Sequence, residues 1–224
     1  MIDQFLWVIF PYLCVAVFVI GHIWRYRIDQ FGWTAKSSEF IEKKQLMIGS
    51  ILFHFSVIPV FFGHIVGLLI PAHWLEALGV TEHLYHIGAV YIGGIFGVVM
   101  LLGMIMLTFR RVTKQAVRRL SSASDITVNF LLLFITFMGV YATLVTNAVV
   151  TDFDYRTSIS VWLRSLFVFS PDANLMTDVP LSFKIHVLTG FLIFALWPAT
   201  RLVHAWSLPF NYVGRSYIIY RKNK

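Results

Sequence analysis

The stretch FHFSVIPVFFGHI, residues 53 to 65, carries two histidines, His54 and His64, inside an apolar segment. The surrounding run from Leu46 to Ile70 contains no Asp, Glu, Lys or Arg. An ionisable side chain is costly in hydrocarbon, and those found there usually mark a functional site. These two histidines therefore raise two questions: what surrounds the apolar segment, and what the segment binds.

Five apolar runs of the chain are long enough to cross a membrane. The 224 residues are 58% hydrophobic and only 13% charged, which is typical of membrane proteins. A helix needs roughly 20 apolar residues to cross about 30 Å of hydrocarbon. We predict an all-α integral membrane protein whose five transmembrane helices lie within residues 1–206, the first being retained rather than removed as a signal peptide. The five runs are Phe5 to Trp24, Leu46 to Ile70, Tyr85 to Phe109, Ile126 to Val150 and Leu181 to Trp206.

Lysine and arginine are distributed unevenly between these runs. They are frequent in the first loop, the third loop and the C-terminal segment, whereas residues 71–84 contain none. Cytoplasmic loops carry an excess of these residues, so we predict an N-terminus outside and a C-terminus in the cytoplasm, in the cell membrane. The net charge of +7 is divided among separate loops rather than gathered on one face, so it does not indicate a nucleic-acid partner.

Two further histidines, His186 and His204, lie in the fifth run, which Pro198 interrupts. Their separation of eighteen residues corresponds to five helical turns and about 27 Å, so both are expected on one face. His54 and His64 are separated by about 15 Å of helical rise. Since successive spans alternate in direction, the second and fifth spans are antiparallel. We therefore expect His54 to face His204 near the cytoplasm and His64 to face His186 near the outside.

Each facing pair offers the two axial ligands of a bis-histidine haem, with iron centres roughly 20 Å apart along the helices. The sequence has no C-x-x-C-H motif, so these would be two non-covalent b haems. Bis-histidine ligation favours electron transfer, because it leaves no axial position for a substrate. One alternative is that the histidines only form hydrogen bonds within the bundle. Another is an ion or proton path, although the runs contain hardly any carboxylate apart from Asp125.

Arginines and glycines near these histidines each have two interpretations. Arg201 precedes His204 by about one turn, and Arg110 and Arg111 end the third run on the same side. Guanidinium groups suit haem propionates, but they also anchor cytoplasmic loops. Glycines at 63, 67, 93, 94, 97 and 190 allow close approach of either a haem or a neighbouring helix.

The start of the third run is rich in groups that could accept protons. His83, Tyr85 and His86 lie here, not far in sequence from His64 and Gly67. Oxidising a quinol requires proton acceptors beside an electron acceptor, and histidine titrates near neutral pH. A quinol site at Gly67, His83, Tyr85 and His86 is one interpretation, and solvated loop histidines are the other.

Two features of the chain bear on structure rather than chemistry. Cys14 is the single cysteine, so no intrachain disulfide forms, and we predict a buried, inert thiol. The long loop from Thr151 to Pro180 contains SVWLRSLFVF, residues 160 to 169. This segment is either an amphipathic helix at the membrane interface or part of an irregular cap.

Several motifs occur in order along the chain: FH with a second histidine ten residues later, FFGHIVG, the HW of the second loop, IGG at 92 to 94, FRR at 109 to 111, KIHVLTG and TRLVHAWSLP. Together they resemble the gamma, or cytochrome b, subunit of membrane-bound respiratory nitrate reductase over nearly the whole chain. The resemblance implies two b haems, oxidation of quinol near the outer haem, and electron transfer through the inner haem. The acceptors would be an iron–sulfur subunit and a molybdenum catalytic subunit that reduces nitrate in the cytoplasm.

The resemblance has one departure and leaves two other functions open. Some family members carry a lysine in the quinol-binding region of the second loop, which this chain lacks. The tail, residues 207–224, mixes basic and aromatic residues, and we predict that it docks the partner subunits; the alternative is a basic segment that lies on the membrane surface. The other functions are a related two-haem subunit that feeds a different reductase, and a haem-free transporter or membrane anchor.

Overall fold

The structure is a computed structural model that describes the chain except residues 34–37, 148–152 and 208–224. All regular elements in these described parts are helical. The long helices are α2 (Phe10–Ile28), α3 (Lys44–His64), α5 (Glu82–Thr113), α7 (Ala123–Tyr141) and α10 (Leu181–Leu196). Short helical segments extend four of them, and the five resulting spans are long and apolar enough to cross a membrane. They are Ile2–Ile28, Lys44–Leu69, Glu82–Thr113, Ala123–Thr146 and Leu181–Ala199, which confirms the prediction of five spans.

Polar side chains determine where α5 and α7 begin. The Thr81 hydroxyl accepts a hydrogen bond from the Leu84 N–H at 3.3 Å. At α7, the Ser122 hydroxyl accepts from the Asp125 N–H at 3.2 Å, and the Asp125 carboxylate accepts from the Ser122 N–H at 3.0 Å. These contacts satisfy N–H groups that the first helical turn leaves unpaired. They also hold a carboxylate at the end of an otherwise apolar helix.

The fifth span is interrupted near Pro198, as the sequence predicts, so the spacing of five regular turns between His186 and His204 does not hold. α10 ends at Leu196, and two 3-10 helices follow: η6 (Trp197–Ala199) and η7 (Arg201–Trp206). Pro198 lies at this break, where it cannot donate the N–H that would continue the helix. His204 is therefore carried by a separate short helix.

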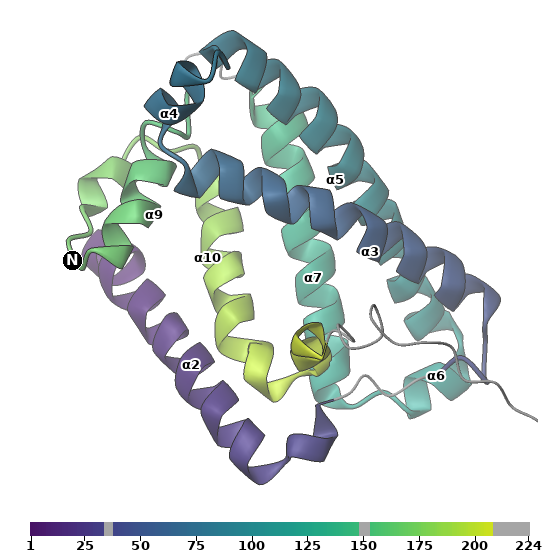
Figure 1. Cartoon of the computed structure of the whole chain (residues 1–224). Helices are drawn as coiled ribbons and strands as arrows, with labels where there is room; N and C mark the ends of the chain where they lie inside the picture. The colour runs from purple at the N-terminus through teal and green to yellow at the C-terminus, as the bar shows by residue number, and fades with distance from the viewer. Residues whose placement is uncertain (34–37, 148–152, 208–224) are drawn as a thin grey trace, which may run out of the picture.

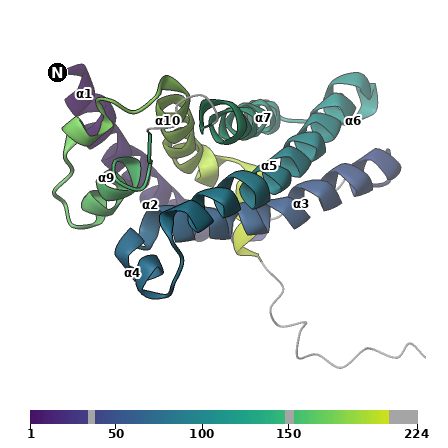
Figure 2. The same cartoon turned by 90° about the horizontal axis from the view of Figure 1, so that it is seen from above.

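The long helices pack one on the next in the order α2, α10, α7, α5 and α3. Seen from above, α10 and α7 lie side by side behind α5 and α3 (Figures 1 and 2). The crossing of α3 and α5 is close because glycines lie at it: a Cβ on Gly103 would come within 2.7 Å of the Phe53 nitrogen. Small residues permit such contacts between membrane helices. Gly94 and Gly97 likewise face side chains of the α7 span, as the helix-packing interpretation predicted.

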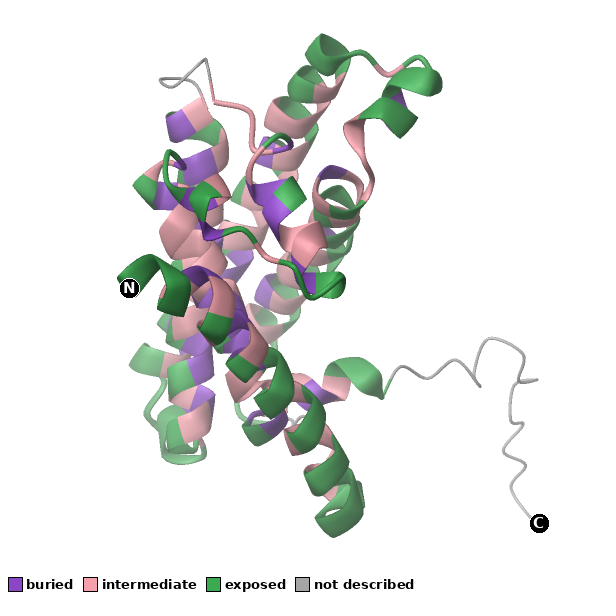
Figure 3. Cartoon of the chain, turned by 90° about the vertical axis from the view of Figure 1, so that its left-hand side faces the viewer, coloured by how far each residue is buried: buried purple, intermediate pink, exposed green. Residues whose placement is uncertain are grey.

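Many residues on the outside of the helices are exposed (Figure 3), and a large share of them are apolar. Phe55 is 70% exposed, Ile95 63% and Phe61 60%. So many exposed large side chains along helices of this length are accounted for by contact with lipid. The chain is a multi-pass membrane protein.

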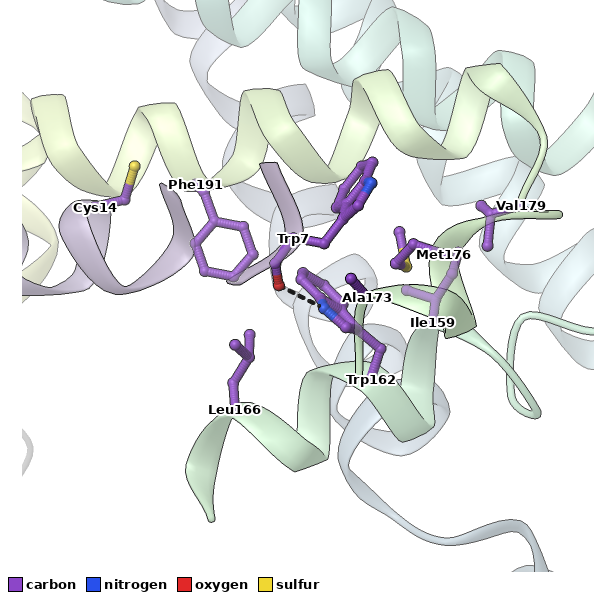
Figure 4. Packing of buried hydrophobic residues seen from close by; sticks show 9 residues of the cluster. All are labelled: Trp7, Cys14, Ile159, Trp162, Leu166, Ala173, Met176, Val179 and Phe191. Carbon is purple, nitrogen blue, oxygen red and sulfur yellow. Dashed lines mark hydrogen bonds between the residues drawn. The ribbon is translucent and has the colours of Figure 1, made fainter. Parts of the chain in front are cut away.

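The helix α9 (Ile159–Phe167) covers one end of α2 and α10, so the segment left undecided by the sequence is mainly helical. The Trp162 indole N–H donates to the Trp7 carbonyl at 2.8 Å, and the two rings meet edge to face (Figure 4). Cys14 is buried in the same cluster, as predicted, together with Phe191. We call this the α9 end of the molecule. The opposite end, where α6 (Gln115–Arg119) follows α5, is the α6 end.

Candidate functional site

His64 and His186 face each other towards the α9 end. His64 is the last residue of α3, and His186 lies in the second turn of α10. Their ring centres are 6.0 Å apart, and the ring planes are inclined by 25°. The next residues after α3 bind α9, because the Leu68 carbonyl accepts a hydrogen bond from the Ser160 hydroxyl at 2.9 Å. The covering helix is therefore anchored close to this pair.

His54 and His204 form a second facing pair, nearer the α6 end. His54 projects from α3 and His204 from η7. Their ring centres are 6.2 Å apart, with an angle of 65° between the planes. The structure thus brings the four predicted histidines together in the two predicted pairs, even though α10 does not extend as far as His204.

In all four histidines the Nδ1 atom is held by a backbone carbonyl. A carbonyl oxygen only accepts, so Nδ1 carries the proton and Nε2 keeps a free lone pair. Metal-binding histidines are commonly oriented in this way. The Nδ1 to oxygen distances are 2.8 Å from His54 to Ser50, 2.7 Å from His64 to Val60, 3.0 Å from His186 to Ile135 and 2.5 Å from His204 to Arg201.

The spacing of each pair leaves room for a metal between the rings. Two metal–imidazole bonds of about 2 Å, plus about 1 Å from each nitrogen to its ring centre, separate the centres by about 6 Å. Among the described residues, no group of three or more His, Cys, Asp or Glu could bind a metal ion unaided. A haem iron needs only two axial protein ligands, since the macrocycle supplies the rest. The residues therefore fit one bis-histidine haem at each pair.

The helix α7 also contacts His186, an interaction that the sequence did not predict. It provides the Ile135 carbonyl that binds Nδ1 of His186. One turn later, a Cβ on Gly139 would lie only 2.8 Å from Cε1 of His186. The absence of a side chain at Gly139 thus makes space for the imidazole. No sequence signal marked this glycine, because its partner lies 47 residues further along the chain.

Arg110, predicted to contact a haem propionate, is bound by the first loop. Its guanidinium donates to the Glu42 carboxylate at 2.7 Å and to the Glu42 carbonyl at 2.8 Å. It also donates to the hydroxyl and carbonyl of Ser38 at 3.1 and 3.0 Å. The Gln45 N–H, with help from Arg110, lowers the pKa of Glu42 and keeps this carboxylate charged. These contacts tie the first loop to the end of α5, and a propionate contact of Arg110 stays a prediction.

The other two candidate propionate ligands lie beside the α7 N-terminus. Arg201 forms an ion pair with Asp125, with nitrogen to oxygen distances of 2.5 and 2.6 Å. Because the Arg201 carbonyl accepts from His204, this ion pair also helps to orient His204. Arg111 donates to the Ser121 hydroxyl at 2.6 Å, while its buried Nε has no hydrogen-bond partner. An unsatisfied buried donor leaves capacity for a further ligand.

A cavity of about 570 Å³ opens beside the start of α5. Three of the four predicted quinol residues, His83, Tyr85 and His86, line it. The fourth, Gly67, packs behind Tyr85, because an added Cβ would collide with the Tyr85 hydroxyl. Residues 153–156 of the long fourth loop form another wall, which sequence reasoning did not foresee.

A comparison with known protein families identifies the family of this chain. The sequence model of the nitrate reductase gamma subunit family matches residues 3–223. This chain belongs to that family. The nitrate reductase gamma chain of Bacillus subtilis is 49% identical to this gamma subunit over 99% of both chains. The respiratory nitrate reductase 2 gamma chain of Escherichia coli is 36% identical over 100% of this chain and 98% of its own.

One longer relative aligns with this gamma subunit over about a third of its own length. The nitrate reductase-like protein NarX of Mycobacterium tuberculosis is 41% identical over the whole of this chain, which spans 34% of its length. The family confirms the resemblance inferred from the motifs. A gamma subunit is one chain of an oxidoreductase, and five membrane-spanning helices suit a membrane component with a role in electron transfer.

Proposed function

We propose that this gamma subunit binds two b haems and carries electrons from membrane quinol to the subunits that reduce nitrate. The observation that supports this most strongly is the pairing of the histidines. At each of two depths, the ring centres of two histidines lie 6.0 or 6.2 Å apart, which leaves room for one metal ion between them. In each ring the Nε2 lone pair remains able to bind a metal, because Nδ1 donates to a backbone carbonyl. A transporter or passive anchor gives no reason for four histidines with this shared geometry.

We propose that all four histidines are axial ligands of haem iron. His64 and His186 hold one haem near the α9 end, and His54 and His204 hold the other near the α6 end. Each haem would supply a one-electron carrier at its histidine pair. The backbone carbonyls orient the four imidazoles by accepting a hydrogen bond from each Nδ1.

The direction of transfer follows from the two ends of the molecule. We propose that the α9 end faces the outside, because residues 71–84 contain no Lys or Arg, and that the α6 end faces the cytoplasm, where Arg110, Arg111 and Arg201 gather. These arginines also supply donors for haem propionates at that end. Quinol would then be oxidised at the cavity containing His83, Tyr85 and His86, close to His64 and His186.

The proposed partners are an iron–sulfur subunit and a molybdenum catalytic subunit at the cytoplasmic end. The sequence predicts that residues 207–224 dock them. Residues 208–224 lie outside the part of the chain that the structure describes. The pair His54 and His204 lies nearer the α6 end, which we propose faces the cytoplasm, so it would be the exit point for electrons.

Membranes that contain the complete enzyme test this function directly. We expect added quinol to produce a b-type reduced-minus-oxidised spectrum with two haems per gamma subunit, and nitrate to reoxidise both. The lack of any b-type spectrum would support a haem-free anchor or transporter. Haems that quinol reduces but nitrate does not reoxidise would indicate a different terminal reductase.

Replacing Gly139 with alanine is expected to disturb the haem near the α9 end. The new methyl group would lie 2.8 Å from Cε1 of His186, so the ring has to move from its position opposite His64. Overpacking of this kind costs about 1–3 kcal/mol. Low-temperature difference spectra should show loss or conversion of one haem component. Gly88→Ala is the control, because a Cβ on Gly88 has no neighbour within 4 Å, and equal spectra in both variants would contradict this role of Gly139.

A further inference from the structure

The long fourth loop places a buried arginine in the wall of the proposed quinol cavity. Arg156 lines the cavity, but its side chain is only 6% exposed. Its guanidinium lies over the Tyr85 ring, 4.5 Å from the ring centre. One of its nitrogens, Nη1, is buried without a hydrogen-bond partner. A buried guanidinium nitrogen without an acceptor is rare and calls for a ligand or a bound water.

Two carboxylates hold Arg156 in place and balance its charge. Asp154 accepts from Nε at 3.2 Å and from Nη2 at 3.1 Å. Glu82, at the start of α5, lies 3.7 Å from Nη2. Burial would lower the pKa of Arg156, but its contacts with Asp154 outweigh burial and raise it, so the guanidinium stays charged.

A pair of tyrosines lies beside this arginine. The hydroxyl groups of Tyr85 and Tyr155 share a hydrogen bond of 2.5 Å that joins α5 to the fourth loop. Burial raises the pKa of Tyr155, so it remains a neutral hydroxyl that can both donate and accept. Together with Phe153, the two rings give the cavity aromatic walls around a few polar groups.

We propose that Arg156 and Tyr155 bind a head-group oxygen of quinol in this cavity. The proposal rests on the proposed function and adds the fourth loop to a site that the sequence predicted on the second and third spans. The aromatic walls suit a flat quinol ring, and a charged donor forms a strong hydrogen bond to its oxygen. The cavity volume of about 570 Å³ lies within the range of roughly 300–1,000 Å³ that is usual for small-ligand sites.

The charges around Arg156 favour a neutral ligand over an anion. Asp154 and Glu82 already place two negative charges beside the guanidinium. A phosphate or carboxylate in the cavity would be repelled by both groups. A quinol or quinone oxygen is uncharged, and it can accept from Nη1 without meeting this repulsion. The arrangement therefore selects for the type of ligand that the reaction needs.

The test uses membranes with the complete enzyme and an alkyl hydroxyquinoline N-oxide, a fluorescent quinol analogue. In Arg156→Gln, we expect its Kd, measured by fluorescence quenching, to rise about tenfold or more, as for loss of a charge-assisted hydrogen bond. The KM for menadiol should rise similarly, with a smaller change in kcat. Tyr155→Phe, which keeps the aromatic ring but removes the hydroxyl, should raise the Kd of the analogue and the KM for menadiol several-fold. After reduction of the membranes with dithionite, the spectra of each variant should show both haems.

Arg164→Gln is the matched control, because Arg164 is another arginine of this region that binds the Leu68 carbonyl but does not line the cavity. The proposal is wrong if Arg156→Gln keeps wild-type affinity and KM, or if Arg164→Gln weakens binding equally. If Arg156→Gln fails to accumulate in the membrane, Arg156→Lys and Tyr155→Phe are measured instead. An unchanged Kd in both of these variants would contradict the proposal. A wild-type enzyme that quinol cannot reduce would instead contradict the proposed function.

Discussion

Membranes with the His204→Ala variant are expected to retain the haem of His64 and His186, which quinol still reduces but nitrate no longer reoxidises. His204 is one of only two protein ligands proposed for the haem nearer the α6 end, and it faces His54 with ring centres 6.2 Å apart. Removing one ligand leaves that iron without its bis-histidine coordination. The measurement is the haem content per gamma subunit, followed by stopped-flow spectra after quinol and then nitrate.

His22→Ala provides the control at the same end of the molecule. Both ring nitrogens of His22 are used, since Nδ1 lies 2.6 Å from the Phe18 carbonyl and Nε2 accepts from the Trp206 indole at 3.1 Å. His22 is therefore not one of the proposed haem ligands, and the His22→Ala variant should keep two haems. Normal nitrate-driven reoxidation in His204→Ala would contradict the order of transfer that we propose.

The His64→Ala variant should show the opposite defect. It is expected to lose the haem near the α9 end and keep the haem of His54 and His204. Quinol should then fail to reduce the remaining haem at the normal rate, because the electron acceptor closest to the cavity is missing. Dithionite, which needs no quinol site, should still reduce it.

The control for His64→Ala is His73→Ala, which changes a histidine in the short helix α4 (Ala72–Ala77) whose ring meets the neighbouring Trp74 ring edge to face. Its haem content and quinol oxidation should equal those of the wild type. If His64→Ala oxidised quinol at the wild-type rate, the site of quinol oxidation would have to lie elsewhere than the α9 end.

How far the sequence could predict the site depended on how each residue reaches it. The histidine pairs could be anticipated because depth in a membrane follows from position along a span, and alternating spans fix which ends meet. His83, Tyr85 and His86 share one helical segment, so they were found together. Tyr155 and Arg156 were missed, because a long loop can return to the bundle at many places and its sequence carries no periodic signal.

The sequence by itself determined the number of spans, since runs of about 20 apolar residues have no other stable environment than lipid. It also determined which histidines lie at matching depths. Only the tertiary structure decided how each residue is held: the carbonyls that bind Nδ1, the space that Gly139 leaves for His186, and the first loop that binds Arg110. It also decided that His204 is carried by η7 after the break at Pro198. These features depend on which helix faces meet, and that is settled by packing between segments distant in the chain.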